Sequence, residues 1–151
     1  MTTFATQRRV AAPRATTFEV FSDFQNAAST VSAIERIEML TEGPNRVGAR
    51  FRETRTMFGR PATETMEVSA FDPPRSYTLA AESHGARYAT TFTFTEAAGG
   101  TEVEMRFVVT PVTFMAKVMG LLMKPMMKKM VAVCAKDLED LARVAEARAQ
   151  A

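Results

Sequence analysis

The sequence is poor in the residues that most often carry metal or covalent chemistry. Its 151 residues include one cysteine, one histidine and no tryptophan. The single cysteine, Cys134, cannot form an internal disulfide, and with only one histidine it cannot build a common metal cluster. No phosphate-binding loop, dinucleotide fingerprint or nucleophile elbow occurs. We therefore predict no metal and no cofactor, assign no catalytic residue, and expect a reducing, cytoplasmic environment.

A strong charge imbalance and a long apolar run are also absent. The formal net charge is +2, and basic residues are interleaved with acids except at Lys124, Lys128 and Lys129. This pattern does not favour a nucleic-acid partner, which usually requires a basic stripe. The longest apolar run, residues 112–123, is too short and too interrupted to span a bilayer, and the first residues lack the apolar segment of a signal peptide. We expect a protein that is neither secreted nor integral to a membrane.

The residues that are present are typical of one globular domain. Hydrophobic residues make up 46% of the chain and charged residues 24%, which indicates neither a disordered chain nor a membrane protein. There is no internal repeat, low-complexity segment or linker rich in Pro, Gly or Ser. We therefore expect residues 1–151 to form a single domain with a substantial core.

Alternation of apolar and polar residues predicts seven β-strands. They cover residues 3–12, 34–41, 47–59, 62–71, 77–81, 88–94 and 103–109. Pro13 opens a short helix that reaches about Phe24, and Asp23 or Asn26 is suited to cap a second short turn before the second strand. Short loops between consecutive strands predict an antiparallel meander, with the first strand paired to the last. Such a curved sheet has a concave side that another element must cover.

The last quarter of the chain predicts the element that covers it. Thr110 can cap a helix and Pro111 suits its first turn, so we expect one long helix from Thr110 to Ala149. Pro125 lacks an amide proton, and with Gly120 nearby it predicts a break in the middle of this helix. The two halves are then expected to point in different directions.

The two halves of this helix differ in apolar pattern. Past Pro125, one stripe carries the apolar residues Met127, Val131, Cys134, Leu138, Leu141 and Ala145. Off that stripe are the charged residues Lys129, Lys136, Asp140 and Arg143. Before Pro125, apolar residues surround the helix and only Lys117 interrupts them. Six of the eleven methionines lie between Met115 and Met130; they form either a loosely packed core or an adaptable ligand surface.

Several short motifs and their order resemble a known superfamily. The motif residues are Ala12, Pro13, Val20, Phe21, Asp23, Gly48, Phe51, Asp72, Pro73, Pro74, Gly100 and Thr101, followed by the helix after Pro111. In order and spacing the chain resembles the START-like (SRPBCC) superfamily, in particular its polyketide cyclase/dehydrase and lipid-transport type. The resemblance covers almost the whole chain. Many members carry a large aromatic residue near the position of Thr30, which this chain lacks.

This resemblance implies an α+β helix-grip fold. A seven-stranded curved antiparallel sheet would wrap around the long C-terminal helix, with two short helices between the first and second strands and a deep apolar cavity inside. The strand pattern then predicts a set of ligand-binding residues. They are Phe51, Glu53, Arg55, Met57, Met66, Tyr77, Leu79, Tyr88, Phe92, Met105 and Phe107 on strands, with Met115, Met119 and Met123 on the helix.

Three polar residues of the predicted site have alternative interpretations. Glu53 and Arg55 share the strand face of Phe51, and a charge in an apolar cavity is costly unless it is paired. They are therefore an anchor for a ligand, a structural ion pair, or a sign that the strand register slips. His84, beside Gly85 in a predicted turn, is either an exposed side chain or a proton shuttle.

Three functions follow from this pattern. The first is a carrier or sensor that binds an apolar small molecule such as a lipid or polyketide. The second is a cyclase or dehydratase that uses the same cavity, with Arg55, Glu53, Tyr88 or His84 polarising carbonyls or moving protons. The third uses the Met-rich helix to contact a partner protein or, transiently, a membrane, with lysines set against anionic headgroups. A monomer and a homodimer both remain open.

Overall fold

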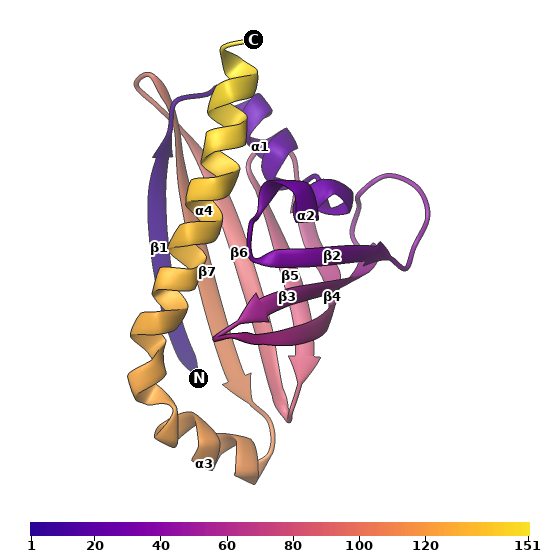
Figure 1. Ribbon diagram of the computed structural model, residues 1–151, viewed down its shortest axis with the longest axis vertical. Helices are drawn as coiled ribbons and strands as arrows, with labels where there is room; N and C mark the ends of the chain where they lie inside the picture. Colours follow the sequence, from indigo (N-terminus) through magenta and orange to yellow (C-terminus); the bar gives the residue numbers. More distant parts are fainter.

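A single antiparallel sheet forms the body of the molecule in the computed structural model, which describes all residues 1–151. Its seven strands lie in the order β1-β7-β6-β5-β4-β3-β2. The strands are β1 (Thr2–Val10), β2 (Ile34–Met39), β3 (Arg50–Met57), β4 (Arg60–Asp72), β5 (Ser76–Ser83), β6 (Ala86–Ala97) and β7 (Gly100–Pro111). Strands β2 to β7 pair in chain order, and β1 pairs with β7, with Val10 opposite Thr101. The predicted meander and the pairing of the first strand with the last are confirmed (Figure 1).

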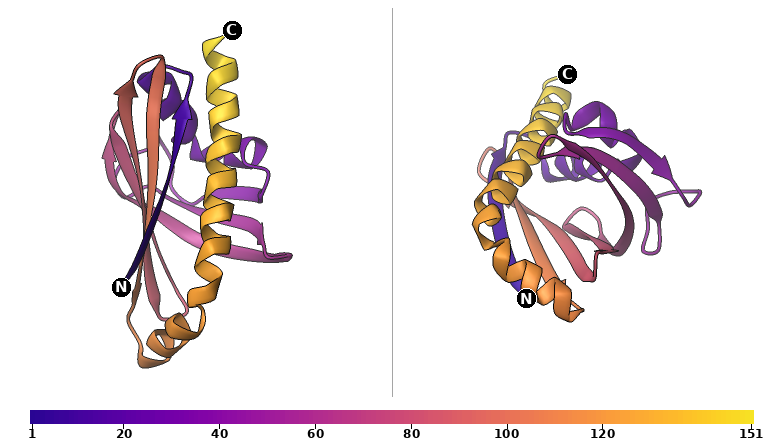
Figure 2. Two further views of the ribbon diagram at one scale, coloured as in Figure 1. Left: turned by 90° about the vertical axis from the view of Figure 1, so that its left-hand side faces the viewer. Right: turned by 60° about the horizontal axis from the view of Figure 1, so that its bottom comes forward.

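Helices lie on one side of this sheet. They are α1 (Arg14–Phe21), α2 (Ala27–Thr30), α3 (Phe114–Leu122) and α4 (Met127–Ala149), with the 3-10 turns η1 (Phe24–Asn26) and η2 (Lys124–Met126). In Figure 2 the sheet curves around an interior and α4 runs along its open side, while α3 turns away at one end. The helix-grip fold, with short helices between β1 and β2 and a long C-terminal helix, is therefore confirmed.

The start of the C-terminal helix was predicted three residues too early. Thr110 and Pro111 belong to β7, where they pair with Arg87 and Ala86 of β6. The helix cap is Thr113, whose side chain accepts a hydrogen bond from the Ala116 amide at 3.1 Å. Thr110 was a suitable cap by residue type, but pairing with β6 gives its main chain partners that local sequence does not reveal. The break at Pro125 is confirmed, because η2 separates α3 from α4 there.

Strand β3 also begins later than predicted. The expectation was a strand from Val47, whereas β3 begins at Arg50. Gly48 has a φ of +94°, which an extended strand residue does not adopt and which glycine tolerates. Val47 and Gly48 therefore end the preceding turn.

The predicted stripe on α4 faces the core. Cys134, Leu138, Leu141 and Ala145 are all buried. Asp140 was expected off this stripe but is only 4% exposed. Its Oδ2 accepts hydrogen bonds from the amide and hydroxyl of Ser32, at 2.9 and 2.8 Å. The prediction was wrong because the segment between α2 and β2 covers that side of the helix, a contact between residues far apart in sequence.

Candidate functional site

The inner face of the sheet is buried at one end and partly exposed at the other. On β6, Phe94 and Phe92 are buried and Tyr88 is half-buried. On β7, exposure likewise increases from Val103 to Phe107. We call the region around Phe94 and Val103 the closed end, and the region around Tyr88 and Phe107 the open end.

An aromatic cluster fills the closed end. Its members are Phe18, Phe21, Phe24, Phe51, Tyr77, Phe92 and Phe94, with ring centroids of contacting pairs between 4.9 and 6.2 Å apart. The Tyr77 hydroxyl donates a hydrogen bond to the Phe21 carbonyl oxygen at 2.9 Å. Burial raises the pKa of Tyr77 well above its usual value, so this hydroxyl stays protonated. The closed end is thus a packed core in which Tyr77 has its polar group satisfied.

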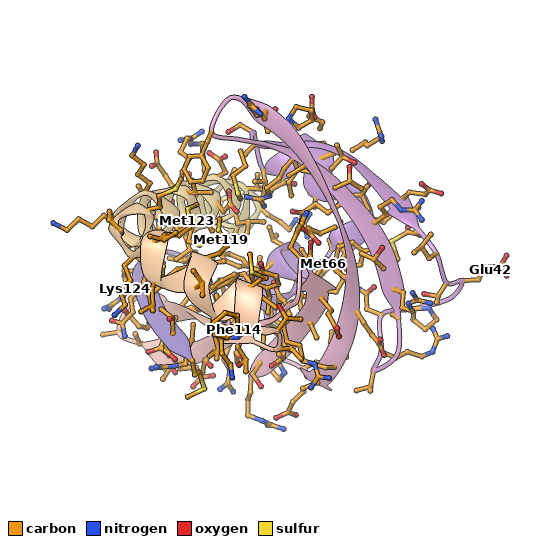
Figure 3. All side chains as sticks on the ribbon, turned by 90° about the horizontal axis from the view of Figure 1, so that it is seen from below. Glu42, Met66, Phe114, Met119, Met123 and Lys124 are labelled. Carbon is orange, nitrogen blue, oxygen red and sulfur yellow. The ribbon has the colours of Figure 1, made fainter.

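The predicted ligand residues fall into three groups. Phe51, Tyr77, Phe92 and Met105 are buried at the closed end. Half-buried positions on the inner face hold Glu53, Arg55, Met57, Met66, Leu79, Tyr88 and Phe107. Met115, Met119 and Met123, from the α3 segment, are exposed. In Figure 3, seen from below, Met119 and Met123 lie on the α3 side of the molecule and Met66 lies across from them on the sheet.

A buried polar group lies between the two ends. On β3, Glu53 and Arg55 share the inner face with Phe51 and are followed by Met57 towards the open end. Arg55 Nε donates to Glu53 Oε1 at 2.7 Å, and an Nη of Arg55 lies 2.9 Å from Asp137 Oδ2 on α4. The side chains of Arg55, Glu53 and Asp137 are 14%, 11% and 10% exposed, respectively. Glu53 and Arg55 form an ion pair on the inner face in a continuous β3–β4 register, so the strand does not slip there. We call Glu53, Arg55 and Asp137 the buried polar group.

The charges within this group influence one another. Burial raises the pKa of Asp137, and the Arg55 charge only partly offsets this effect. Burial also disfavours the Arg55 cation, but the charges of Glu53 and Asp137 outweigh burial and raise its pKa, so Arg55 stays charged. Asp137 Oδ1 is buried and has no hydrogen-bond partner. Because a buried acceptor without a partner is unfavourable, this oxygen is a position at which a donor on a bound molecule would be stabilised.

Further polar side chains lie on the inner face. Glu64 of β4 stands directly opposite Glu53 in the strand register and is half-buried. Burial, followed by the charge of Glu64, raises the pKa of Tyr88. Arg8 lies on the inner face of β1, and its Nε is buried without a partner. The interior therefore combines apolar walls with a small number of polar groups, which is the usual character of a small-molecule site.

Sequence reasoning missed Asp137 and Glu64. A signal for Asp137 was present, because it lies three residues after Cys134 and four before Leu141, on the apolar stripe of α4. Glu64 follows from the register alone, since it faces Glu53 across the hairpin formed by the predicted strands 47–59 and 62–71.

The remaining reactive side chains do not join this group. His84 lies in the β5–β6 turn with a φ of +53°, and its Nδ1 is 2.7 Å from the Ser83 hydroxyl. Cys134 is buried on α4, and burial, together with the charge of Asp137, raises its thiol pKa to about 11. Such a thiol is protonated at neutral pH and has little nucleophilic character.

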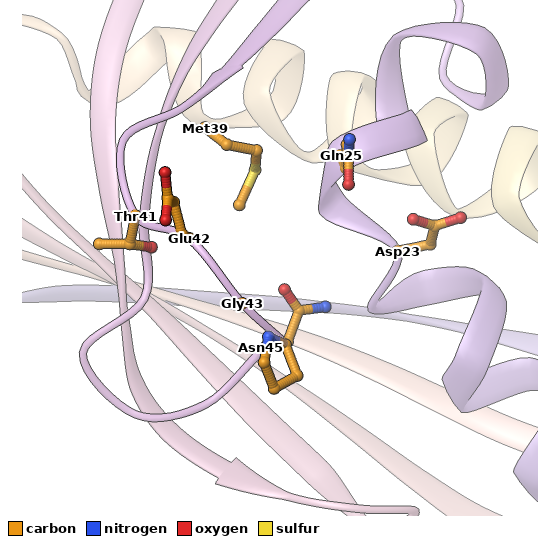
Figure 4. Close-up of a pocket in the computed structure, with 8 residues that line it drawn as sticks. Asp23, Gln25, Met39, Thr41, Glu42, Gly43 and Asn45 are labelled. Atoms are coloured by element: carbon orange, nitrogen blue, oxygen red, sulfur yellow. The ribbon is translucent and has the colours of Figure 1, made fainter.

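Two hollows lie outside the interior. One, of about 380 Å³, is lined by Asp23, Gln25, Met39, Thr41, Glu42, Gly43, Pro44 and Asn45 (Figure 4). The other, of about 500 Å³, lies where the β6–β7 turn meets the start of α1. No three His, Cys, Asp or Glu side chains are arranged to hold a metal ion. None of the helices combines the length and the apolar character needed to cross a bilayer.

Solved structures with this fold include aromatase/cyclases. The di-domain aromatase/cyclase StfQ of the steffimycin biosynthetic pathway matches with a TM-score of 0.80 and 16% identity, over 99% of this chain and 52% of StfQ. This chain thus spans about half of the di-domain protein. The ZhuI aromatase/cyclase from Streptomyces sp. R1128 matches with a TM-score of 0.76 and 19% identity, over 97% of this chain and 94% of that chain. Protein TTHA0849 from Thermus thermophilus matches with a TM-score of 0.73 and 18% identity, over 95% and 99% of the two chains.

These identities are low enough that the structural matches establish the fold alone. Among curated proteins, none matches this sequence. The family model described as polyketide cyclase / dehydrase and lipid transport, however, matches residues 1–146, almost the whole chain. The chain therefore belongs to the polyketide cyclase/dehydrase and lipid-transport family.

Proposed function

We propose that this protein binds a largely apolar small molecule, such as a lipid or a polyketide, in the open end of its interior. The observation that supports this most strongly is the half-buried apolar surface of Met57, Met66, Leu79, Tyr88 and Phe107 beside the buried polar group. Apolar side chains that stay partly in contact with water on a concave face are stabilised when a ligand covers them. A carrier or sensor requires no further chemistry.

The polar end of the ligand would lie against the buried polar group. Arg55 offers donors to a carbonyl or carboxylate, and the unpartnered Asp137 Oδ1 accepts from a hydroxyl. The apolar body would extend towards Met66 and the α3 segment. This arrangement favours a molecule with one oxygen-bearing end and an apolar body over a pure hydrocarbon.

Native mass spectrometry of the protein as purified from its host tests the proposal. We expect an added mass on the folded protein, and denaturing extraction should release a fatty acid, isoprenoid or polyketide-like compound. Met119→Lys places a charge beside the open end, and we expect it to abolish uptake of an apolar fluorescent probe. Val47→Lys, which changes an exposed apolar residue in a distant turn, is the matched control. An empty protein that also fails to take up the probe would contradict the proposal.

A second candidate function is a cyclase or dehydratase reaction in the same interior. The observation that favours it is the convergence of Glu53, Arg55 and Asp137 within hydrogen-bond distance, together with the raised pKa of Asp137. A carboxyl group whose pKa is raised by burial is suited to both accept and return a proton. A guanidinium that remains charged is suited to stabilise an oxyanion.

The corresponding steps would be an intramolecular aldol closure. Asp137 takes a proton from a carbon next to a carbonyl, and Arg55 stabilises the enolate oxygen that forms. The enolate carbon then attacks a second carbonyl of the same molecule, and one carbon–carbon bond forms. The new alkoxide takes the proton back from Asp137, so no oxidant, reductant or metal is required.

Two substitutions separate carrier from enzyme. Glu53→Gln should leave the affinity of a simple apolar carrier nearly unchanged, and a large loss of affinity would count against that function. Asp137→Asn removes the proposed acid and base but keeps the size of the side chain. Host cells that express the wild type or Asp137→Asn are extracted, and mass spectrometry measures the open-chain and cyclised compounds in each extract. For an enzyme, Asp137→Asn should raise the ratio of open-chain to cyclised compound, whereas for a carrier it changes only the amount bound.

A further inference from the structure

One helix of the molecule has no core to pack into. None of the residues of α3 is buried. Phe114 is 76% exposed, Leu121 65% and Leu122 68%. Figures 1 and 2 place α3 at one end of the molecule, beyond the ends of most strands, with its outer side uncovered. Globular monomers rarely expose this many large apolar side chains together, so the surface is suited to a further apolar contact.

The exposed apolar surface extends beyond α3 at both of its ends. Val112 precedes the helix and is 48% exposed, and Met123 follows it and is 43% exposed. We call residues 112–123 the apolar tip. Its members surround the helix rather than forming one stripe, so packing one face on the sheet would still leave other faces in water.

Basic side chains accompany the apolar tip. Lys117, Lys124, Lys128 and Lys129 are all exposed. Between Glu104 and Asp137 the sequence contains no acidic residue. Glu82, near the end of the adjoining strand β5, lies 3.5 Å from Arg87 in an ion pair. The tip and the residues that follow it to Lys129 therefore carry four lysines, which have no acidic partner on their own segment.

We propose that the apolar tip docks onto an anionic membrane surface. Its apolar side chains would enter the boundary between headgroups and acyl chains, and the four lysines would contact anionic headgroups. This combination of an apolar body and a basic rim is typical of helices that lie in a membrane interface. A second copy of the chain fits less well, because two tips in contact would bring both sets of four lysines together.

The orientation follows from the position of the tip. Figure 3 views the molecule from the end that carries Phe114, Met119 and Lys124, and the open end of the interior faces the same way. A docked protein would therefore turn its open end towards the bilayer. Docking itself requires no ligand and no catalysis, so it is independent of the proposed function.

Co-sedimentation of the full chain with vesicles tests this proposal. Vesicles of phosphatidylcholine with phosphatidylserine should bind the protein, and vesicles of phosphatidylcholine alone should bind it at least about tenfold more weakly, because each lysine near an anionic surface adds attraction. Raising the salt concentration from about 0.1 M to about 1 M shortens the Debye length from about 10 Å to about 3 Å and should release most of the protein.

Two sets of variants separate the apolar and the basic contributions. Leu121→Asp with Leu122→Asp should lower binding by about tenfold or more, because the apolar side chains no longer enter the interface. Val47→Asp, at an exposed apolar residue far from the tip, should bind like wild type. Replacing Lys124, Lys128 and Lys129 with Gln should remove the preference for anionic vesicles. Replacing the exposed Arg36, Arg50 and Arg60 with Gln changes the net charge equally and should retain that preference.

Several outcomes would overturn the proposal. One is that the wild type does not bind anionic vesicles at low salt. Another is that the variant with Leu121→Asp and Leu122→Asp binds them as well as the wild type does. A dimer in analytical ultracentrifugation that the same variant converts to monomer would assign the tip to a second copy instead. Because both leucines are largely exposed, circular dichroism should show that the variant folds, and a loss of binding then reports on the surface.

Discussion

Helices α3 and α4 are both rich in apolar residues, yet the fold uses them in opposite ways. In α4, Leu138 is 1% exposed and Ala142 and Ala145 are fully buried. In α3, no residue is buried. The apolar residues of α4 form one stripe, which β1 and the helices α1 and α2 cover from Cys134 to Ala145. Those of α3 surround the helix, and one sheet edge cannot cover them all. Apolar content alone therefore does not predict burial, whereas its distribution around the helix does.

The buried packing of α4 on the sheet, which α3 lacks, is tested most strongly at Arg55. Arg55→Met leaves Glu53 and Asp137 as buried carboxylates without their cation, and we expect a loss of about 3–5 kcal/mol in the free energy of unfolding. Arg52→Met is the matched control, because Arg52 pairs with Glu38 at 2.9 Å and is 43% exposed. Its loss should lie within about 1 kcal/mol. Urea unfolding measures both, and equal losses would mean that the buried polar group does not hold α4 on the sheet.

A pair of leucines compares the two helices directly. Leu138→Ala removes a buried side chain from α4 and should cost about 2–5 kcal/mol of unfolding free energy. Leu121→Ala in α3 removes a side chain that is already 65% exposed and should change stability by about 0.5 kcal/mol or less. Chemical unfolding curves give both values. A substantial loss for Leu121→Ala would contradict the description of α3 as lying outside the core.

Two tyrosines compare the closed and open ends. Tyr77→Phe removes the donor to the Phe21 carbonyl oxygen and leaves that buried acceptor unpaired, so we expect a loss of about 1–3 kcal/mol. Tyr88→Phe, at a half-buried position of the open end, should have a smaller effect. Thermal unfolding is a sufficient measurement. If the two losses were alike, the closed end would not be the more tightly specified region.

The smallest expected effect concerns pH. Burial raises the pKa of Asp137 in the folded protein, so the unfolded chain loses this proton first, near the ordinary value of about 3.9. From there up to the raised pKa, the wild type loses stability as pH rises. Asp137→Asn has no such proton. The stability of wild type minus that of the variant should therefore fall with rising pH through this window and then become level. Urea unfolding at several pH values measures it, and a difference that rises would contradict the assignment.

The sheet could be predicted from sequence because each strand carries its own signal. Alternation along the segments around Tyr77, Phe92 and Met105 predicted the inner face that the register confirms. The cap of the C-terminal helix was misplaced at Thr110, because pairing of that residue with β6 is a long-range property. Local sequence predicts conformation well when the residue and its partners are near in the chain.

The site was predictable in part. The positions of Glu53 and Arg55 on the inner face follow from their parity with Phe51, and the cost of burying a charge made an ion pair one of the alternatives. Their partner Asp137 comes from a helix about eighty residues later, and only the packing of α4 on the sheet brings it there. The exposure of α3 could not be predicted either, since an apolar segment is equally compatible with a core and with an unoccupied docking surface.

The pairing of β1 with β7 has a consequence for synthesis of the protein. Val10 pairs with Thr101, so β1 has no neighbour in the sheet until β7, the last of the seven strands in chain order, has been made. The apolar surfaces of β1 and α1 that α4 covers must also wait for that helix. During translation, apolar strand faces and an unpaired strand are therefore exposed together, a condition that favours aggregation and slow folding. The nascent chain is expected to depend on chaperones that shield apolar segments until the C-terminal helix has been released.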